Sequence, residues 1–429
     1  MKTMKTAKQW RFVLAIVAVF TLFAAACGND DDAGITTAAP AETTAAAPAE
    51  TTEAPATTAV ELEPVKIGFD SQEEELFSII EARMAAEATV AYINAELGGV
   101  DGHPIELMVC TSGDGPEGSV ACAQEFVNDD DIMVMLTSSF SSNEASEVTV
   151  PAGLPMLALA NLPDDWQRET EWIMDPGFLG LMQGPVDYAA DVLEVGSMAI
   201  ICADDPFFLE ACDAASGFAT AAGMDVFDVT PAGFEQADFT GVVTASNAAD
   251  ADSILIVVDG SQCAPLADSL AALSVEATAL TVDTCAFQDV VAGGALDGWL
   301  VFGASALPVD PSLATAEVLE GQRIIAEYGS SDAELFGLAG WAVANVLATH
   351  DALERVGFDN LSRESVNTAL GETQLELGWY SDISCPGPDT FPGACVASVL
   401  VLEVVGETME FVSVAPINFS ELSEFSDLG

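Results

Sequence analysis

The stretch AAEATVAYINAELGGVDGHPIELMVC, residues 85–110, decides the fold class of this chain. It contains the end of a predicted helix that covers about residues 73–97, followed by the strand PIELMVC, residues 104–110. The short buried strand VKIGF, residues 65–69, precedes the helix. A strand, a helix and a second strand in this order predict one unit of a parallel sheet.

The same alternation continues along the chain and then starts again. After the second strand we expect a helix, a strand, a short helix and a strand, at residues 118–127, 131–136, 144–150 and 154–160. The second series comprises helices at about residues 181–194, 206–222, 237–248 and 264–273, and strands at 197–202, 224–229, 253–258, 277–282 and 298–303. Two successive parallel series predict an α/β fold with two lobes.

The last part of the chain adds a pair of helices, at about residues 314–328 and 333–356, and a terminal hairpin in residues 395–414 with its turn at 406–408. We assign residues 62–178 and 304–356 to the first lobe, and residues 179–303 and 357–429 to the second.

The N-terminus, residues 1–26, has the order of a secretory signal peptide: four basic residues, then the apolar run FVLAIVAVFTLFAAA. Cys27 follows, and two interpretations stay open. Lipid attachment to its thiol would precede cleavage by a lipoprotein signal peptidase, although Ala24 stands where that signal usually has leucine. Ordinary cleavage after residues 24–26 would leave a free thiol instead. We favour lipidation, because an exposed thiol is a liability in an oxidising compartment, and a lipidated Cys27 anchors the chain to a membrane.

Residues 27–61, rich in Ala, Thr, Pro and Glu, have the composition of a disordered stalk. About 370 residues remain for the folded part, and no later apolar run approaches the ~18 residues of a membrane span. Four of the ten bases precede Cys27, so six bases face 69 acids after it, a net charge of −63. This charge argues against a nucleic-acid partner, which needs clustered Lys and Arg, and suggests an acidic surface suited to a salty medium.

The eight cysteines that remain after Cys27 fall into neighbouring pairs. Eight cysteines allow 105 connectivities, and sequential pairing is the simplest, because each bridge then closes a short loop in an exported chain. A zinc site would need the close CxxC spacing that the sequence lacks. The expected pairs are Cys110 with Cys122, Cys202 with Cys212, Cys263 with Cys285, and Cys385 with Cys395.

Enzymatic motifs are scarce. His103 and His350 lie far apart and lack partner motifs. The sequence has no G-x-S-x-G, P-loop or H-E-x-x-H motif, and no G-x-G-x-x-G motif follows the first strand. We therefore expect no catalytic residues, no cofactor and no metal site.

The loops that follow the strands are better candidates, because open α/β sheets bind ligands at the carboxyl ends of their strands. The loop TSSFSSN, residues 137–143, holds Ser138 and Ser139 and suits an anionic group such as a carboxylate; a plain helix-capping loop is the alternative. Asn161 follows another strand of the first lobe. In the second lobe Asp204, Asp205, Phe207, Asp259 and Asp283 follow strands, and their acids would suit a cationic or amine group.

Several segments of the chain resemble type I periplasmic substrate-binding proteins of the branched-chain amino acid transporter class. INAELGGVDGHPIEL, residues 93–107, is the most specific of them, and the similarity covers about residues 65–341. The others are ACAQEFV, GLPMLALAN, CADDPFF, AAGMDVFDV and ADFTGVV. This resemblance implies two Rossmann-like lobes, joined by three crossovers, that close on a small ligand in the cleft between them.

By the same resemblance, Ser138 and Ser139 would bind the ligand's carboxylate, Ala160 and Asn161 would line the first lobe, and Asp283 would lie near the ligand's amino group. Phe207 stands where the family often has a tyrosine, and ALANLPDDW, residues 158–166, replaces the usual threonine turn. These departures bear on the ligand and not on the fold.

We therefore expect an extracytoplasmic solute-binding lipoprotein that is not an enzyme and delivers a small polar ligand, an amino acid or a related amide or carboxylate, to an ABC permease. The alternative is a ligand-sensing receptor domain that signals through a partner, and an extracytoplasmic enzyme is a third. The sequence specifies neither the ligand nor the permease.

Overall fold

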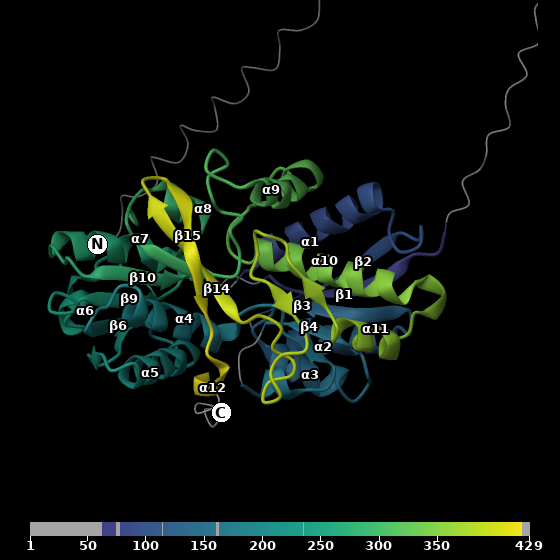
Figure 1. Ribbon diagram of the computed structural model, residues 1–429, viewed down its shortest axis with the longest axis horizontal. Coiled ribbons are helices and arrows are strands. Elements are labelled where there is room, and N and C mark those ends of the chain that lie inside the picture. Colours follow the sequence, from purple (N-terminus) through teal and green to yellow (C-terminus); the bar gives the residue numbers. More distant parts are fainter. Residues whose placement is uncertain (1–61, 74–77, 114, 160–162, 235, 423–429) are drawn as a thin grey trace, which may run out of the picture. The chain divides into compact units, whose positions relative to one another are not determined.

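The computed structural model describes residues 62–73, 78–113, 115–159, 163–234 and 236–422 (Figure 1). The predicted signal peptide, Cys27 and the predicted stalk lie outside the described residues. Within the described ranges, no helix has the length and apolar character needed to cross a membrane.

The first sheet is built from the segment that opened the sequence analysis. Its strands run in the order β2-β1-β3-β4-β5, and neighbouring strands are parallel. This arrangement confirms the predicted parallel α/β unit. The strands are β1 (Val65–Gln72), β2 (Ile105–Ser112), β3 (Ile132–Thr137), β4 (Met156–Ala158) and β5 (Glu171–Trp172).

Strand β1 is longer than predicted, and the helix after it begins later. Asp70, Ser71 and Gln72 continue the pairing with β2 as far as Ser112, whereas the predicted strand ended at residue 69 and the predicted helix began at about residue 73. Their polarity is compatible with a buried strand because each side chain has a hydrogen-bonding partner; the Asp70 carboxylate, for example, accepts from the hydroxyls of Ser119 and Thr137 at 2.6 and 2.9 Å.

Helices cover this sheet. Helix α1 contacts α9 and α10, and α2 contacts α3. Alternate residues of β1, namely Val65, Ile67 and Phe69, point into the core that α1 and α10 share. The helices are α1 (Ile80–Tyr92), continued by a π-helical turn (Ile93–Leu97), α2 (Pro116–Asn128), α3 (Ser142–Thr149), α9 (Ala316–Tyr328), α10 (Ala339–Val356) and α11 (Arg363–Leu370).

The second sheet follows the order β15-β14-β11-β10-β9-β6-β7, with β8 also paired to β6. Strands β6 to β11 are parallel, whereas β14 and β15 form an antiparallel hairpin that adds to β11. The hairpin turns at residues 406 and 407, as predicted. The strands are β6 (Ser197–Ala203), β7 (Asp225–Val226), β8 (Thr230–Ala232), β9 (Ser253–Val257), β10 (Thr278–Val282), β11 (Leu300–Gly303), β14 (Ser398–Val405) and β15 (Thr408–Pro416).

Both faces of the second sheet are buried. Along β9, Ile254 and Ile256 belong to one apolar cluster, and Leu255 and Val257 belong to the other. Such a continuous apolar run is typical of a parallel strand with helices on both sides. Figure 1 labels these helices around the teal strands: α4 (Gly177–Asp191), α5 (Pro206–Ala221), α6 (Thr240–Ala245), shorter than predicted, α7 (Gly260–Ala272) and α8 (Gln288–Ala292).

Three segments connect the two sheets and hydrogen-bond to one another. Ser305, after β11, bridges to Tyr380, and the backbone N–H of Ile173, after β5, donates to the carbonyl of Gly393 at 2.8 Å. The short strands β12 (Gln374–Leu375) and β13 (Ile383–Ser384) lie in the third segment, and the short helix α12 (Phe419–Leu422) follows β15. The exact lobe boundaries stay a prediction; α11, placed in the second lobe by sequence, contacts α10 and β3 of the first.

The four predicted disulfides are present with sequential pairing. Cys110 is bonded to Cys122, Cys202 to Cys212, Cys263 to Cys285, and Cys385 to Cys395. Each bridge closes a loop of 10 to 22 residues.

Candidate ligand-binding site

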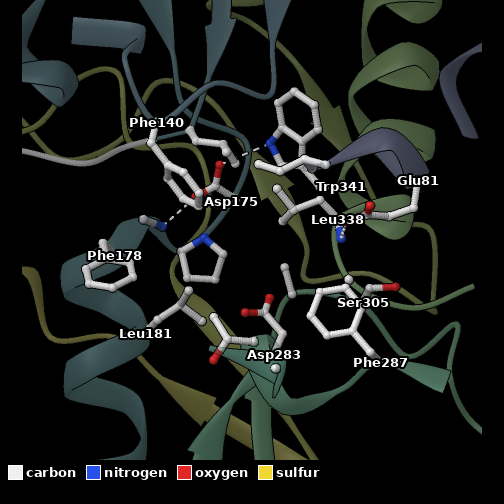
Figure 2. Close-up of a pocket in the computed structure, with 18 of the residues that line it drawn as sticks. Glu81, Phe140, Asp175, Phe178, Leu181, Asp283, Phe287, Ser305, Leu338 and Trp341 are labelled. Carbon is white, nitrogen blue, oxygen red and sulfur yellow. Dashed lines mark hydrogen bonds between the residues drawn. The ribbon is translucent and has the colours of Figure 1, made fainter. Parts of the chain in front are cut away.

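A cavity of about 180 Å³ is lined by residues of both lobes and of the connecting segments. Phe140 and Leu159 follow strands of the first sheet, Asp259 and Asp283 follow strands of the second, and Tyr380 belongs to the third connection. The lining is largely aromatic and aliphatic, with a few carboxyl groups among the rings (Figure 2). This composition is typical of a small-molecule site.

Asp175 is held at the wall of the cavity by two donors. One carboxylate oxygen accepts the backbone N–H of Gly177 at 2.6 Å, and the other accepts the indole N–H of Trp341 at 3.1 Å (Figure 2). The side chain is 8% exposed. Burial raises its pKa to about 7, although both hydrogen bonds act in the opposite direction.

Glu81 approaches the cavity from the first turn of α1. Its carboxylate accepts the backbone N–H of Leu338 at 3.3 Å, where the chain turns into α10. Gly337 forms this turn with φ of +56°, and a Cβ there would lie 2.6 Å from a Glu81 oxygen, so the position requires glycine. Burial raises the pKa of Glu81 to about 7.

Asp283 lies directly after β10 and presents its carboxylate to the cavity (Figure 2). Within the described part of the chain, no other residue donates a hydrogen bond to this carboxylate. Burial raises its pKa to about 7, its own backbone N–H opposes this, and the charge of Glu81 adds to the increase. Asp259, also in the lining, caps α7 instead, and its carboxylate accepts from Ser261.

The aromatic lining comes from distant parts of the chain. Trp341 packs against Phe69 of β1 with ring centroids 6.4 Å apart, and the Tyr380 hydroxyl donates to the Met174 carbonyl at 2.9 Å. Their polar groups are thus directed to the protein, and both residues line the cavity. Phe140, Phe178, Phe208 and Phe287 complete the aromatic set.

The predicted carboxylate loop makes its own hydrogen bonds. The backbone N–H of Ser138 donates to the Asp70 carbonyl, that of Ser139 to Thr137, and that of Phe140 to the side-chain oxygen of Gln72 at 3.1 Å. The Ser139 hydroxyl donates to the same Gln72 oxygen at 3.2 Å. Ser138 and Ser139 are fully buried and are not in the cavity lining.

Of the other predicted residues, Asp259 and Asp283 line the cavity, and Asp204 and Asp205 do not. Ala160 and Asn161 lie outside the described residues, and Phe207 is described only as part of α5. The neighbouring Phe208 lines the cavity and is 5% exposed. Ligand contact by each predicted residue stays a prediction.

Sequence reasoning missed Glu81, Asp175, Trp341 and Tyr380. The last three lie in or after the connecting segments, where no strand-end rule applies, and Glu81 fell inside a helix predicted to begin earlier. The position of Glu81 in the first turn of the helix that follows β1 is the one sequence feature that could have indicated a role at the strand ends.

The remaining ionisable groups lie elsewhere. His103 stacks on Phe358, and His350 contacts the Gly99 carbonyl. Across the described residues, no group of three or more His, Cys, Asp or Glu side chains is arranged to hold a metal ion.

Comparison with known proteins agrees with this architecture. Residues 64–398 match the family model described as periplasmic binding protein. The chain belongs to the periplasmic binding protein family. This confirms the resemblance found in the sequence. Members of the family bind solutes and are not enzymes, and membership implies an extracytoplasmic location. None of the curated proteins matches the chain.

Solved structures of periplasmic binding proteins share the fold. A leucine binding protein from Thermotoga maritima superposes with a TM-score of 0.67 at 15% identity, covering 82% of this chain and 99% of that one. An ABC transporter substrate-binding protein from Sphaerobacter thermophilus gives 0.69 at 18% identity, with coverages of 82% and 98%. A fatty acid ABC transporter substrate-binding protein from Thermomonospora curvata gives 0.68 at 16% identity, with coverages of 84% and 94%.

Proposed function

We propose that this protein is the solute-binding component of an ABC importer, which captures a small solute in the cavity and presents it to a permease outside the cytoplasm. The observation that carries the proposal is the cavity itself: residues that follow strands of both sheets and residues of the connections line one cavity. A hinged pair of lobes around such a space is the arrangement in which ligand binding couples to closure.

The class of solute does not follow from the structural neighbours. One is named for leucine, another was solved with isoleucine, and a third is named for fatty acids. Since their identities to this chain are 13% to 16%, they support the fold and leave the solute to be argued from the cavity.

A thermal-shift screen of the purified full-length chain tests the proposal. The screen covers amino acids, amides, urea, organic amines, aromatic acids and fatty acids. A solute present at 100 times its Kd stabilises the native state by roughly 2.7 kcal/mol, which is measurable as a rise in Tm. No rise with any class of solute would contradict the proposal.

A transport assay separates import from sensing. Deletion of the gene is expected to abolish uptake of the identified solute by the source cells, because the permease would receive no loaded protein. Normal uptake in the deletion strain, together with a lost cellular response to the solute, would favour the sensor alternative.

The proposed lipid anchor has its own test. Cells grown with a clickable fatty acid are expected to label the wild-type chain and not a Cys27→Ser variant, and the variant is expected in the soluble fraction. Equal labelling of both chains would contradict an anchor at Cys27.

A further inference from the structure

The cavity indicates a chemical class of solute, and this inference rests on the proposed function. A free amino acid carries an ammonium and a carboxylate, and each charge needs a partner when it leaves water. The donors and acceptors that line the cavity therefore indicate which of the two charges the protein can pair.

Among the residues that the structure describes, no basic side chain lines the cavity. The six bases that follow Cys27 are all bonded elsewhere. Lys66 pairs with Asp129 and Asp131, Arg83 with Glu73 and Glu87, Arg168 with Asp165 and Glu171, Arg323 with Glu96, Glu320 and Glu327, and Arg355 with Asp351, while Arg363 donates to four backbone carbonyls near β3.

The two large neutral donors in the lining are also occupied. Trp341 donates its indole N–H to Asp175, and Tyr380 donates its hydroxyl to the Met174 carbonyl. In the serine loop, the Gln72 side-chain oxygen accepts from the Ser139 hydroxyl and the Phe140 N–H. Gln72 thus takes the place that a ligand carboxylate oxygen would need in this loop. Among the described lining residues a carboxylate would find no cation, and the Thr284 hydroxyl, which is buried without a partner, is a neutral donor left to it. One neutral hydroxyl does not balance a buried carboxylate charge.

The acceptors show the opposite state. Asp283 presents its carboxylate to the cavity, and no other described residue donates to it. Glu81, 8% exposed, accepts only from backbone N–H groups, its own and that of Leu338 at 3.3 Å. Asp175 raises the local negative charge further. Burial works against the ionised forms of these groups, and nearby carboxylates add repulsion: Glu334 acts on Glu81, Asp283 and Asp165 act on Asp175, and Glu81 acts on Asp283. A ligand cation would supply the missing opposite charge.

The rest of the lining fits the body of such a ligand. Six aromatic side chains share the lining with the carboxylates, and an aromatic face attracts a cation when the two lie within about 6 Å. A dry cavity of about 150 Å³ holds benzene, so this cavity of about 180 Å³ has room for one ring or a short branched chain together with an ammonium group.

We propose that the solute is a small organic cation with an apolar body, a primary amine that lacks a carboxylate. Asp283 is the counter-charge of the cation, Glu81 and Asp175 add to the negative field, and the aromatic side chains enclose the apolar body.

Isothermal titration of the full-length chain with two matched series tests this assignment. The first series is isoamylamine, leucine and isocaproate, and the second is phenethylamine, phenylalanine and hydrocinnamate. Within each series the apolar body stays nearly constant while the charged groups change. We expect the amine to bind at least about tenfold more tightly than the amino acid, and the acid to show no binding, because an unpaired buried carboxylate costs several kcal/mol.

Two variants identify the counter-charge. Asp283→Asn preserves the shape of the side chain and removes its charge, and we expect it to weaken amine binding by about tenfold or more. Asp268→Asn, on the exposed side of α7, changes the net charge equally and should leave the affinity unchanged. Far-UV circular dichroism and Tm of both variants show whether each is folded.

The outcomes separate this inference from the proposed function. Tighter binding of an amino acid or an acid would overturn the inference and leave a solute-binding protein. Binding of none of the six compounds would also overturn it, and the broader solute screen would then decide the proposed function by itself. Amine binding that is equal in the wild type and in Asp283→Asn would overturn the role given to Asp283.

Discussion

The strand-end loops of the two lobes contain polar groups in opposite states. In the first lobe, the serine loop after β3 is rich in hydroxyl and N–H donors, and its own chain, chiefly Gln72, satisfies them. In the second lobe, Asp283 after β10 has no donor from another described residue and faces the cavity. The comparison teaches that a polar loop becomes a binding site only where the fold leaves its groups unsatisfied.

The two states have different energetic consequences. The serine loop contributes to the stability of the protein without ligand, because its buried donors are paired within the chain. An open carboxylate in a cavity costs stability until a ligand pairs with it. Mutations in the serine loop of the first lobe should therefore lower the stability of the protein, whereas mutations at Asp283 in the second lobe should lower its affinity for the ligand.

The largest expected effect comes from the loss of a disulfide, compared between one bridge of the second lobe and one bridge of the first. Replacing Cys263 and Cys285 with alanine opens a loop of 22 residues and should cost about 3 kcal/mol. Cys285 ends the short 3₁₀ turn that begins at Asp283, so this variant should also bind the amine more weakly. Chemical denaturation and isothermal titration measure the two effects.

The bridge between Cys110 and Cys122 provides the matched control. It closes a loop of 12 residues, so its removal should also cost about 3 kcal/mol. Cys110 and Cys122 do not line the cavity, and the affinity for the amine should stay unchanged. An equal loss of affinity in both double variants would contradict the special position of Asp283.

The next effect tests the closure of the serine loop. Gln72→Ala leaves the Phe140 N–H and the Ser139 hydroxyl without their acceptor, and we expect a loss of about 2 kcal/mol. The substitution vacates a space the size of a carboxamide, and the Phe140 N–H and the Ser139 hydroxyl point into it. Acetate or formate should therefore raise the Tm of this variant and not that of the wild type.

Gln262→Ala is the corresponding variant in the second lobe. The Gln262 side chain donates to the Ala232 and Gly233 carbonyls and accepts from the Asp259 N–H. Its loss should destabilise the protein to a similar extent, but the two carbonyls left behind repel an anion, so acetate should give no recovery. Recovery of both variants by acetate would indicate a general salt effect.

Much of the fold could be predicted from the sequence, because the signals are local. β9 is a continuous apolar run, Pro206 begins α5, and the cysteines of each disulfide lie close in sequence. The end of β1 could not be predicted, since Asp70 and Gln72 are polar, and their partners Ser119, Thr137 and Ser139 are at least 49 residues away.

The candidate site was predictable only in part. Asp259 and Asp283 follow parallel strands, whose carboxyl ends meet at one edge of a sheet, and both line the cavity. Asp175 and Trp341 are joined by a hydrogen bond across 166 residues, which no local pattern reports. The sequence predicted that the hydroxyl-rich serine loop binds a ligand carboxylate. Gln72, which occupies two of its donors, was not recognised as part of the preceding strand.

A smaller effect concerns pH. Burial raises the pKa values of Glu81, Asp175 and Asp283 to about 7, whereas unfolded carboxyls titrate near pH 4. Between pH 4 and 7 the native state therefore holds more protons than the unfolded state, so stability falls as the pH rises across this range. Glu171, whose pKa burial raises to about 8, acts in the same direction outside the cavity.

The Asp283→Asn variant isolates one of these groups. Its stability should fall less steeply than that of the wild type between pH 5 and 8, by on the order of 1 kcal/mol, as measured by urea denaturation. Amine affinity of the wild type should rise between pH 6 and 8, as Asp283, Glu81 and Asp175 ionise. Parallel stability curves for the two chains would show that Asp283 titrates normally.

The smallest effect distinguishes the cavity from the acidic surface around it. Salt screens exposed charges much more than buried pairs, and a net charge of −63 after Cys27 favours unfolding through self-repulsion. From low to molar NaCl, we expect the Tm to rise by a few degrees at most, with the gain approaching a plateau, while amine affinity falls by less than about threefold. Magnesium bound to the same surface, measured as a control, should be displaced over this range. A tenfold or larger loss of amine affinity would place the amine on the acidic exterior. The difference between the unpaired Asp283 in the second lobe and the satisfied serine loop in the first would then have no role in ligand binding.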